Sequence, residues 1–250
     1  MDNYLQYSYD IKITVNDMDF NERIKPSAVM SYFQDIATEH AEILGIGYKA
    51  MLDKGLAWIM SRLCYKVYRN PKINEVLTIK TYPAKATSAT AVRNYYIFDQ
   101  NGNKVITGSS RWCLIDVKNR QIARTSLAFE NFPDYDYIPF SPFENANAKV
   151  DFDCNLENLQ YTQFKVYVTD LDRNLHLNNS RYGDVLLNVC ELEFLKKKRI
   201  EHFDINFMSE LFCGDTFKAY KIVTDNTLTV QAVKDDGTIV FRAKAETIDN

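Results

Sequence analysis

The sequence of 250 residues lacks any run of about 18 apolar residues, the shortest stretch usually read as a membrane-spanning helix. Its first residues, Met1 to Tyr4, also lack the basic and apolar regions of a signal peptide. The net charge of −3 argues against general affinity for nucleic acid, which requires a basic face. We therefore expect a cytoplasmic protein that has neither nucleic acid nor a membrane as its partner.

The cysteines are few and are not grouped. All five stand alone, with no C-x-x-C pair and no His-rich segment, which argues against a zinc site and a disulfide framework. We accordingly expect no metal and no cofactor, and we expect the cysteines to be small buried apolar side chains. They are Cys64, Cys113, Cys154, Cys190 and Cys213.

The sequence does contain a polar segment that occurs twice. Residues 169–180 hold two carboxylates, three carboxamides and one of only three histidines, directly before a helical pattern. Residues 16–27 have the same skeleton 153 positions earlier, but Arg23 stands where the second copy has His176. The matched pairs are Val15 with Val168, Asp17 with Asp170, Asp19 with Asp172, Asn21 with Asn174 and Ser27 with Ser180.

Each copy is followed by the same order of secondary-structure patterns. Apolar residues at spacings of three and four predict a helix from Pro26 to about Gly45 and another from about Tyr182 to Leu192. Runs rich in Val, Ile, Thr, Tyr and Phe then predict strands, and the last two of each half join across Asn-Gly or Asp-Gly turns. We expect an α+β tandem repeat, each unit a curved antiparallel sheet around one central helix. The expected strands are residues 57–69, 75–84, 90–99, 103–116, 201–209, 215–223, 227–234 and 238–248.

Residues 118–160 lose this periodicity. Pro133, Pro139 and Pro142 fall among Asp, Asn and aromatic residues there, which predicts an extended connector on the surface. We expect an N-terminal unit at residues 1–125, a connector at 126–160 and a C-terminal unit at 161–250.

One concentrated positive run, Lys196 to Arg199, comes after the second predicted helix. It is either the solvated end of that helix, where cations favour the helix dipole, or a surface that docks an acidic carrier.

The second copy of the polar segment offers the residues for chemistry. Alternating residues in a loop can point to one side, so Asp172, Asn174 and His176 can converge on a single cavity. The helix start after the loop adds unpaired backbone N–H groups and a positive dipole end, both suited to a developing oxyanion. A carboxylate, a carboxamide and an imidazole beside such an anion site suit acyl transfer to water.

Other residues of the segment have structural explanations. Asp170 is expected to cap a turn, since its counterpart Asp17 persists in the first copy. Residues 178–180 sit where helix N-caps belong. The segment also resembles the first half of a calcium loop, but Leu175 and Arg181 occupy the places that need Gly and Glu, so we reject a metal site.

The string at residues 170–182 closely resembles the signature D-L-D-x-N-x-H-x-N-N-x-x-Y of the acyl-ACP thioesterases of plants and bacteria. The resemblance covers nearly the whole chain, since those enzymes are likewise two hot-dog units in tandem. It implies hydrolysis of the thioester between a fatty acyl chain and the phosphopantetheine of acyl carrier protein (ACP), which releases free fatty acid. It also implies that the catalytic groups lie in the second unit, while the first mainly shapes the acyl pocket.

By this resemblance Asp172, Asn174 and His176 match the functional aspartate, asparagine and histidine of the family. Glu210 is the best match to a further acid on the strand after the helix. In the plant enzymes a cysteine directly follows that glutamate, whereas this chain has Leu211.

The mechanism expected from this match uses carboxylates rather than a cysteine nucleophile. Cys213 lies two positions beyond the matching place, and nothing near it in sequence supplies an electropositive setting for a thiolate. Asp172 would activate water or attack the thioester carbon, and Asn174 would orient it. His176, with Glu210 as its partner or as a second base, would protonate the leaving thiol or assist the water.

Substrate contacts are expected in both halves. Backbone N–H groups near Asn178 and Asn179 would hold the oxyanion. In the first half, strand alternation would put Trp58 and Met60 on one face, where they are candidates to line an apolar acyl tunnel. Most apolar residues on such a face only pack in the hydrophobic core.

The hot-dog fold hosts several functions, so the fold alone does not decide between them. An acyl-CoA thioesterase, a hydroxyacyl dehydratase and a non-catalytic acyl-thioester sensor are the alternatives, and the full D-x-N-x-H string favours the acyl-ACP thioesterase. Acyl chain length stays open, because one methylene changes pocket energetics by only about 1 to 3 kcal/mol. Two units in one chain already form a pair, so the protein is expected to be a monomer or a homodimer.

Overall fold

The computed structural model describes residues 5–129 and 141–249, and the chain forms two compact units. Unit 1 comprises Met1–Ile13 and Tyr32–Asn147, and unit 2 comprises Thr14–Ser31 and Ala148–Asn250. The boundary falls inside helix α1 (Pro26–Ile43). The first copy of the polar segment therefore lies in the same unit as the second copy.

Unit 1 is built on an antiparallel sheet with the strand order β1-β3-β4-β5-β2, and β6 pairs with β5. The four long strands lie close to the ranges expected from the sequence. The elements are β1 (Tyr7–Lys12), α2 (Tyr48–Asp53), β2 (Leu56–Val67), β3 (Val76–Pro83), β4 (Ala91–Phe98), β5 (Lys104–Asp116), β6 (Gln121–Ala123) and a 3-10 turn at Thr125–Leu127.

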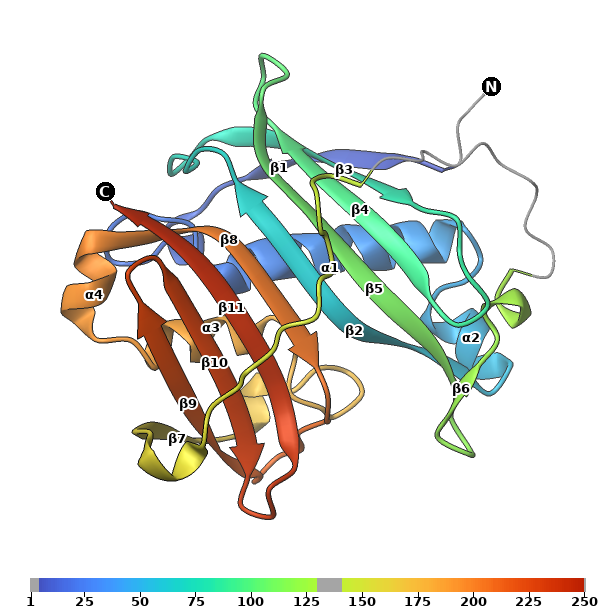
Figure 1. The fold of residues 1–250 in the computed structure, drawn as a ribbon. Coiled ribbons are helices and arrows are strands. Elements are labelled where there is room, and N and C mark those ends of the chain that lie inside the picture. Colours follow the sequence, from blue (N-terminus) through green and yellow to red (C-terminus); the bar gives the residue numbers. More distant parts are fainter. Residues whose placement is uncertain (1–4, 130–140, 250) are drawn as a thin grey trace. The chain divides into compact units, whose positions relative to one another are not determined.

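Helix α1 packs on one face of this sheet, where it lies along β2, β4 and β5 in Figure 1. Phe33 is fully buried, and its ring stacks on Tyr95 of β4 with ring centroids 4.3 Å apart. Gly108 of β5 makes room for this contact, because a Cβ atom there would lie 2.2 Å from Cε2 of Phe33. The helix ends before Gly45, whose φ of 70° stops it as the sequence predicts.

Unit 2 holds the second sheet, with the strand order β8-β11-β10-β9-β7, again antiparallel. Tyr182 of α3 places its ring edge-on to Phe207 and Phe241, which fixes the helix against one face of the sheet. Each unit thus has the sheet and packed helix of the predicted α+β tandem hot-dog. The elements are 3-10 turns at Val15–Asp17, Leu156–Asn158 and Val168–Asp170, β7 (Tyr161–Lys165), α3 (Arg181–Asn188), α4 (Leu192–Lys197), β8 (Lys198–Phe207), β9 (Thr216–Thr224), β10 (Thr227–Lys234) and β11 (Ile239–Asp249).

The prediction of one continuous helix to Leu192 is wrong. Helix α3 ends at Asn188, and Glu191 is extended, with ψ of 143°, before α4 begins. Lys221 of β9 holds this break, since its Nζ donates to the carbonyl of Val189 and to Oε1 of Glu191, both at 2.6 Å. The apolar spacing continues across the break, so the sequence pattern alone does not reveal it.

The expected surface connector is partly buried. Asn147 is 4% exposed, and its Nδ2 donates to Ser109 of unit 1 at 2.7 Å. Within unit 2, Asn206 accepts a hydrogen bond from the amide of Val150 at 2.8 Å. Pro133 and Pro139 lie outside the described residues.

The cysteine expectation is only partly correct. Cys64 is buried, and Cys113 and Cys190 are half-buried, but Cys154 and Cys213 are exposed. Within the part of the chain that the structure describes, no helix is both long and apolar enough to cross a membrane.

We predict that Gly108→Ala destabilises the protein by about 1–3 kcal/mol, because the new methyl group overlaps the Phe33 ring and the backbone carbonyl of Cys64. Urea unfolding of the single variant measures this cost. In a Phe33→Leu background the same change should cost less. An equal cost in both backgrounds would show that the Phe33 ring is not the obstacle.

Candidate active site

The two copies of the polar segment fold into loops with the same backbone hydrogen bonds. In the second loop Asp170 caps the turn, as expected, because its Oδ2 accepts from the amide of Tyr167 at 2.9 Å. Its carbonyl accepts from the amide of Asn178 at 2.9 Å. In the first loop Asp17 makes the matching bonds to the amides of Thr14 and Lys25, at 2.6 and 2.8 Å.

Asp172 organises the centre of the second loop. Its Oδ1 accepts from the backbone amides of Asn174 at 2.8 Å and of His176 at 3.2 Å. Its own amide donates to the carbonyl of His176 at 2.8 Å. Among the described residues, Oδ2 of Asp172 has no hydrogen-bond partner, so one carboxylate oxygen holds the loop and the other is available.

Asp19 repeats this arrangement in the first loop. Its Oδ1 accepts from the amides of Asn21 at 2.7 Å and of Arg23 at 3.0 Å, and its amide donates to the carbonyl of Arg23. The backbone match includes a left-handed residue, Leu175 with φ of 63° and Glu22 with φ of 55°. Residues other than Gly and Asn rarely adopt this backbone conformation. The hydrogen bonds to the aspartate therefore hold each loop in a strained shape.

The loops differ in the contacts that their side chains make beyond this shared backbone. Arg23 of the first loop donates from its guanidinium group to the carbonyl oxygens of Leu195, Lys196 and Lys198. Asn21 adds a bond from Nδ2 to the carbonyl of Leu195 at 3.1 Å. The first loop thus caps the C-terminal end of α4, where unpaired carbonyls and the negative end of the dipole favour a cation.

The basic run lies at this helix end, and part of its charge is offset within unit 2. Lys196 pairs with Glu193 at 2.7 Å, and Lys198 pairs with Asp249 at 2.8 Å. Lys196 and Lys197 form the last turn of α4, as one expectation holds, whereas Lys198 and Arg199 begin β8. Docking of an acidic carrier by this run stays a prediction.

In the second loop His176 meets an acid instead of helix carbonyls. Its Nδ1 lies 3.6 Å from Oε1 of Glu210, an ion-pair distance when the imidazole is protonated. The backbone brings the two together, because His176 forms a bridge with Phe212 and the amide of Leu177 donates to the carbonyl of Leu211 at 2.8 Å. The ring of Phe212 packs edge-on to the imidazole at 4.9 Å. The side chains of His176 and Glu210 are 30% and 29% exposed, so a solute can reach them.

The carboxamides near the helix start have different surroundings. Asn174 is exposed, and its side chain has no hydrogen-bond partner among the described residues. Asn178 acts as a cap, since its Oδ1 accepts from both the amide and the hydroxyl of Ser180. The backbone amide of Asn178 is already used by Asp170, whereas that of Asn179 has no acceptor within the described part of the chain.

Tyr182, the last residue of the motif, is a neighbour of the site that the sequence patterns did not single out. It is 3% exposed. Burial, and secondarily the charges of Glu210 and Asp172, raise the pKa of Tyr182 well above its usual range. The signal in the sequence that could have found it is its place at the end of the motif.

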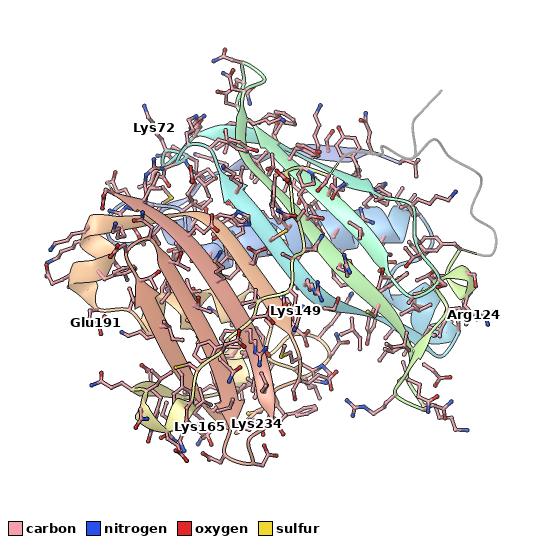
Figure 2. All side chains as sticks on the ribbon, in the orientation of Figure 1. Lys72, Arg124, Lys149, Lys165, Glu191 and Lys234 are labelled. Carbon is pink, nitrogen blue, oxygen red and sulfur yellow. The ribbon has the colours of Figure 1, made fainter. Side chains whose placement is uncertain are left out.

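The loop that carries Glu210 is anchored by Asp215. Its Oδ2 accepts from the amide of Phe212 at 3.1 Å and from Nζ of Lys234 at 2.9 Å. The bond from Lys234 is the main cause that lowers the pKa of Asp215 below its usual value. Lys234, at the end of β10, is labelled in Figure 2.

The position matched to the cysteine of the plant enzymes holds no nucleophile in this chain. Leu211 is fully buried and has no nucleophilic atom. Cys213 lies in an exposed turn next to Gly214, whose φ is 91°.

The two residues expected to line an acyl tunnel, Trp58 and Met60, lie in unit 1. Met60 is 3% exposed. The indole of Trp58 donates to the carbonyl of Ile46 at 3.1 Å and packs near Phe129 with centroids 6.0 Å apart. These contacts give both residues a packing role, and their role in binding an acyl chain stays a prediction.

Sequence comparison identifies a family for both halves of the chain. The model of the acyl-ACP thioesterase N-terminal domain matches residues 4–129, and that of the C-terminal domain matches residues 154–246. The chloroplastic palmitoyl-acyl carrier protein thioesterase of Cuphea hookeriana is 23% identical over 198 residues, which cover 74% of this chain and 46% of that protein. The chain thus spans about half the length of the curated relatives it matches.

Two solved structures show the same fold. The acyl-ACP thioesterase from Bacteroides thetaiotaomicron has a TM-score of 0.82 at 22% identity, covering 97% of this chain and 98% of its own. The 12:0-ACP thioesterase from Umbellularia californica has a TM-score of 0.87 at 16% identity, covering 98% of each chain. At these identities the likeness establishes the tandem hot-dog fold alone.

We predict that Arg23→Met lowers the free energy of unfolding by about 1–3 kcal/mol, because the carbonyls at the end of α4 lose a charged donor. Chemical denaturation measures the loss. The control is Arg124→Met, an exposed arginine where a change within about 0.5 kcal/mol is expected. Equal losses in the two variants would contradict a capping role.

We predict that Asp215→Asn destabilises the protein in a pH-dependent way. Because the pKa of Asp215 is lowered in the fold, its contribution is complete above the unfolded value of about 4 and is lost as pH falls below it. Melting temperatures from pH 7 to pH 3 should therefore converge for the variant and the wild type. Asp225→Asn, in an exposed turn, is the control. A difference that persists unchanged at pH 3 would exclude the carboxylate as its source.

Proposed function

The chain belongs to the acyl-ACP thioesterase family, and we propose that it hydrolyses the thioester of fatty acyl-ACP to give free fatty acid and holo-ACP. The observation that carries the proposal is the pairing of His176 with Glu210 beside Asp172 in one of two otherwise matching loops. The first loop has the same backbone but uses Arg23 to cap a helix. A scaffold alone does not require the histidine and its acid.

Asp172 is the residue that we assign to water activation. Its Oδ1 is held by two amides, so Oδ2 takes the proton as water adds to the thioester carbon. The exposed carboxamide of Asn174, two residues on, orients the water or the carbonyl. In the alternative mechanism, Oδ2 of Asp172 attacks the thioester carbon directly and forms a covalent intermediate.

His176 is assigned to the leaving thiol. Glu210 faces Nδ1 of His176 at 3.6 Å, so Nε2 is the ring nitrogen left free among the described residues to act on the leaving group. As the carbon–sulfur bond breaks, Nε2 gives its proton to the sulfur of phosphopantetheine. The reaction balances as thioester plus water to carboxylic acid plus thiol. The amide of Asn179 and the start of α3 are the candidates for the oxyanion.

The acyl carrier protein is the proposed partner, and acyl-CoA is the alternative substrate. Trp58 and Met60 are proposed to border the acyl chain in unit 1. Paired assays with acyl-ACP and acyl-CoA of the same chain decide between the two thioesters. Binding of either without thiol release would favour a sensor and would contradict the hydrolase.

We predict that Asp172→Asn and His176→Ala each lower kcat for acyl-ACP hydrolysis by about 10²- to 10⁴-fold, and that Glu210→Gln has a smaller effect. Thiol release is measured on folded protein. The matched control is Asp19→Asn, which alters the same backbone arrangement in the loop without the histidine. It should leave the rate per folded molecule within about twofold of the wild type.

If Asp172→Asn and His176→Ala retained near-normal rates, the assignment of the site would be wrong. If Asp19→Asn lost as much activity as Asp172→Asn, the loss of activity would be due to a change in loop structure, because no residue of the first loop is assigned to catalysis.

A further inference from the structure

The large apolar and aromatic side chains that unit 1 exposes are clustered at one end of it. Eight are exposed among the described residues of this unit, and six of them lie in α2, in the β5–β6 hairpin or in the segments beside these elements. The other two are Tyr68 and Val76. Exposed apolar residues are normally scattered singly, so such a cluster indicates a contact surface. We call this part of unit 1 the α2–β6 end, and its six residues are Ile43, Tyr48, Leu52, Val117, Ile122 and Leu127.

The segments of the α2–β6 end are joined by packing and by hydrogen bonds. Met51 of α2 is buried in one small core with residues of β5 and β6. The amide of Val117 donates to the carbonyl of Gly55 at 2.9 Å, and Nζ of Lys54 donates to the carbonyl of Leu127 at 3.0 Å. The exposed residues therefore belong to one continuous part of the unit, and Figure 1 shows α2 beside the hairpin there.

The apolar side chains lie on both sides of this end. Ala123 of β6 pairs with Leu114 and packs toward α2, so by strand alternation Ile122 points to the opposite face of the hairpin. Ile122 is 68% exposed, and Leu52 of α2 is 47% exposed. In Figure 1 the hairpin extends beyond the end of the sheet. The exposed residues thus surround a projecting tip and do not line a groove.

Cations surround these apolar residues. Residues 48–55 and 116–127 include five basic and two acidic residues, although the whole chain has a net charge of −3. One of the two acids, Asp116, is occupied within the hairpin, because it accepts from the amide and from Nδ2 of Asn119 at 2.8 and 3.2 Å. Lys49, Lys118 and Arg124 have no ion pair among the described residues. All five basic residues are exposed, and they are Lys49, Lys54, Lys118, Arg120 and Arg124.

Exposed apolar side chains among unpaired cations are the features with which a peripheral protein binds an anionic lipid surface. The cations attract the negative headgroups, and the apolar side chains enter the boundary between headgroups and acyl chains. Tyr48 suits the same layer, because a phenol has an apolar ring and a polar tip. The expectation that a membrane is not a partner rests on the lack of a long apolar run and of a signal peptide, and a peripheral contact needs neither.

An acidic protein is the other kind of partner that these cations would attract. A rigid protein surface docks on one face of an element, whereas a lipid layer is soft and closes around a projecting tip. Because Leu52 and Ile122 lie on opposite sides of the α2–β6 end, the lipid surface is the better match.

We propose that the α2–β6 end of unit 1 binds the surface of an anionic lipid membrane. Leu52 and Ile122 enter the interface, and Lys118 and Arg124 contact the phosphates of the headgroups. The contact is peripheral and reversible, and salt weakens it because the charges are exposed. It goes beyond the proposed hydrolysis and uses none of the residues assigned to it.

Flotation of the full chain with lipid vesicles tests the proposal. Vesicles of phosphatidylcholine mixed with phosphatidylglycerol should bind the wild type, and vesicles of phosphatidylcholine alone should bind it about tenfold more weakly or not at all. Raising the salt concentration to about 0.5 M should release the protein from the anionic vesicles.

Two matched double variants locate the contact. Lys118→Gln with Ile122→Ser removes one cation and one apolar side chain from the hairpin, and it should weaken binding to anionic vesicles by about tenfold or more. Lys72→Gln with Val76→Ser makes the same kinds of change at exposed positions elsewhere in unit 1 and should bind like the wild type. Figure 2 labels Lys72 and Arg124, which lie far apart on the unit. All four substituted side chains are exposed, so both variants should keep the melting temperature of the wild type.

The outcomes separate the proposal from its alternatives. Equal binding to neutral and anionic vesicles, no binding to either, or equal losses in the two double variants would each overturn it. Binding of holo-ACP that the hairpin variant loses, without binding of vesicles by the wild type, would make this end a protein-docking surface and would also overturn it. Vesicle binding is measured without substrate, so its result does not depend on whether the chain hydrolyses acyl-ACP.

Discussion

The hydrogen bonds that one aspartate oxygen accepts from two backbone amides determine the shape of the loop on which the candidate site is built. In the second loop Oδ1 of Asp172 binds the amides of Asn174 and His176, and the carbonyl of His176 binds back to Asp172. This closed set of bonds holds Leu175 in a left-handed conformation that its side chain disfavours. The direction of the His176 side chain depends on that backbone. Without the carboxylate, His176 would lose this constraint and would keep only the backbone bridge to Phe212 near Glu210.

Comparison of the two loops distinguishes residues that shape the loop from residues proposed to act in catalysis, which a single copy of the loop would not allow. Asp19 and Asp172 make the same backbone bonds, so an aspartate at this position is explained by structure alone. The difference lies four residues later. Arg23 reaches the carbonyls of α4, whereas His176 faces an acid on another segment. One backbone therefore presents a helix cap in one copy and a titratable pair in the other.

The sequence was sufficient for the parts of the fold that obey local rules. Strand ranges in unit 1, the stop of α1 at Gly45 and the turn-capping role of Asp170 come from periodicity, glycine and carboxylate chemistry. The break after α3 was missed, because it depends on Lys221 from a distant strand. The pairing of Arg23 with α4 was also missed, since it arises from contacts between residues far apart in sequence.

The dual use of Asp172 decides how its substitutions are to be interpreted. Asparagine keeps an oxygen that can accept from the two amides, so Asp172→Asn removes the charge and spares most of the loop. Alanine removes the charge and both acceptors together, which releases the strained Leu175 and with it His176. A loss of activity in the alanine variant therefore mixes two causes. The asparagine variant, compared with Asp19→Asn in the loop that has no histidine, isolates the contribution of the carboxylate charge to the reaction.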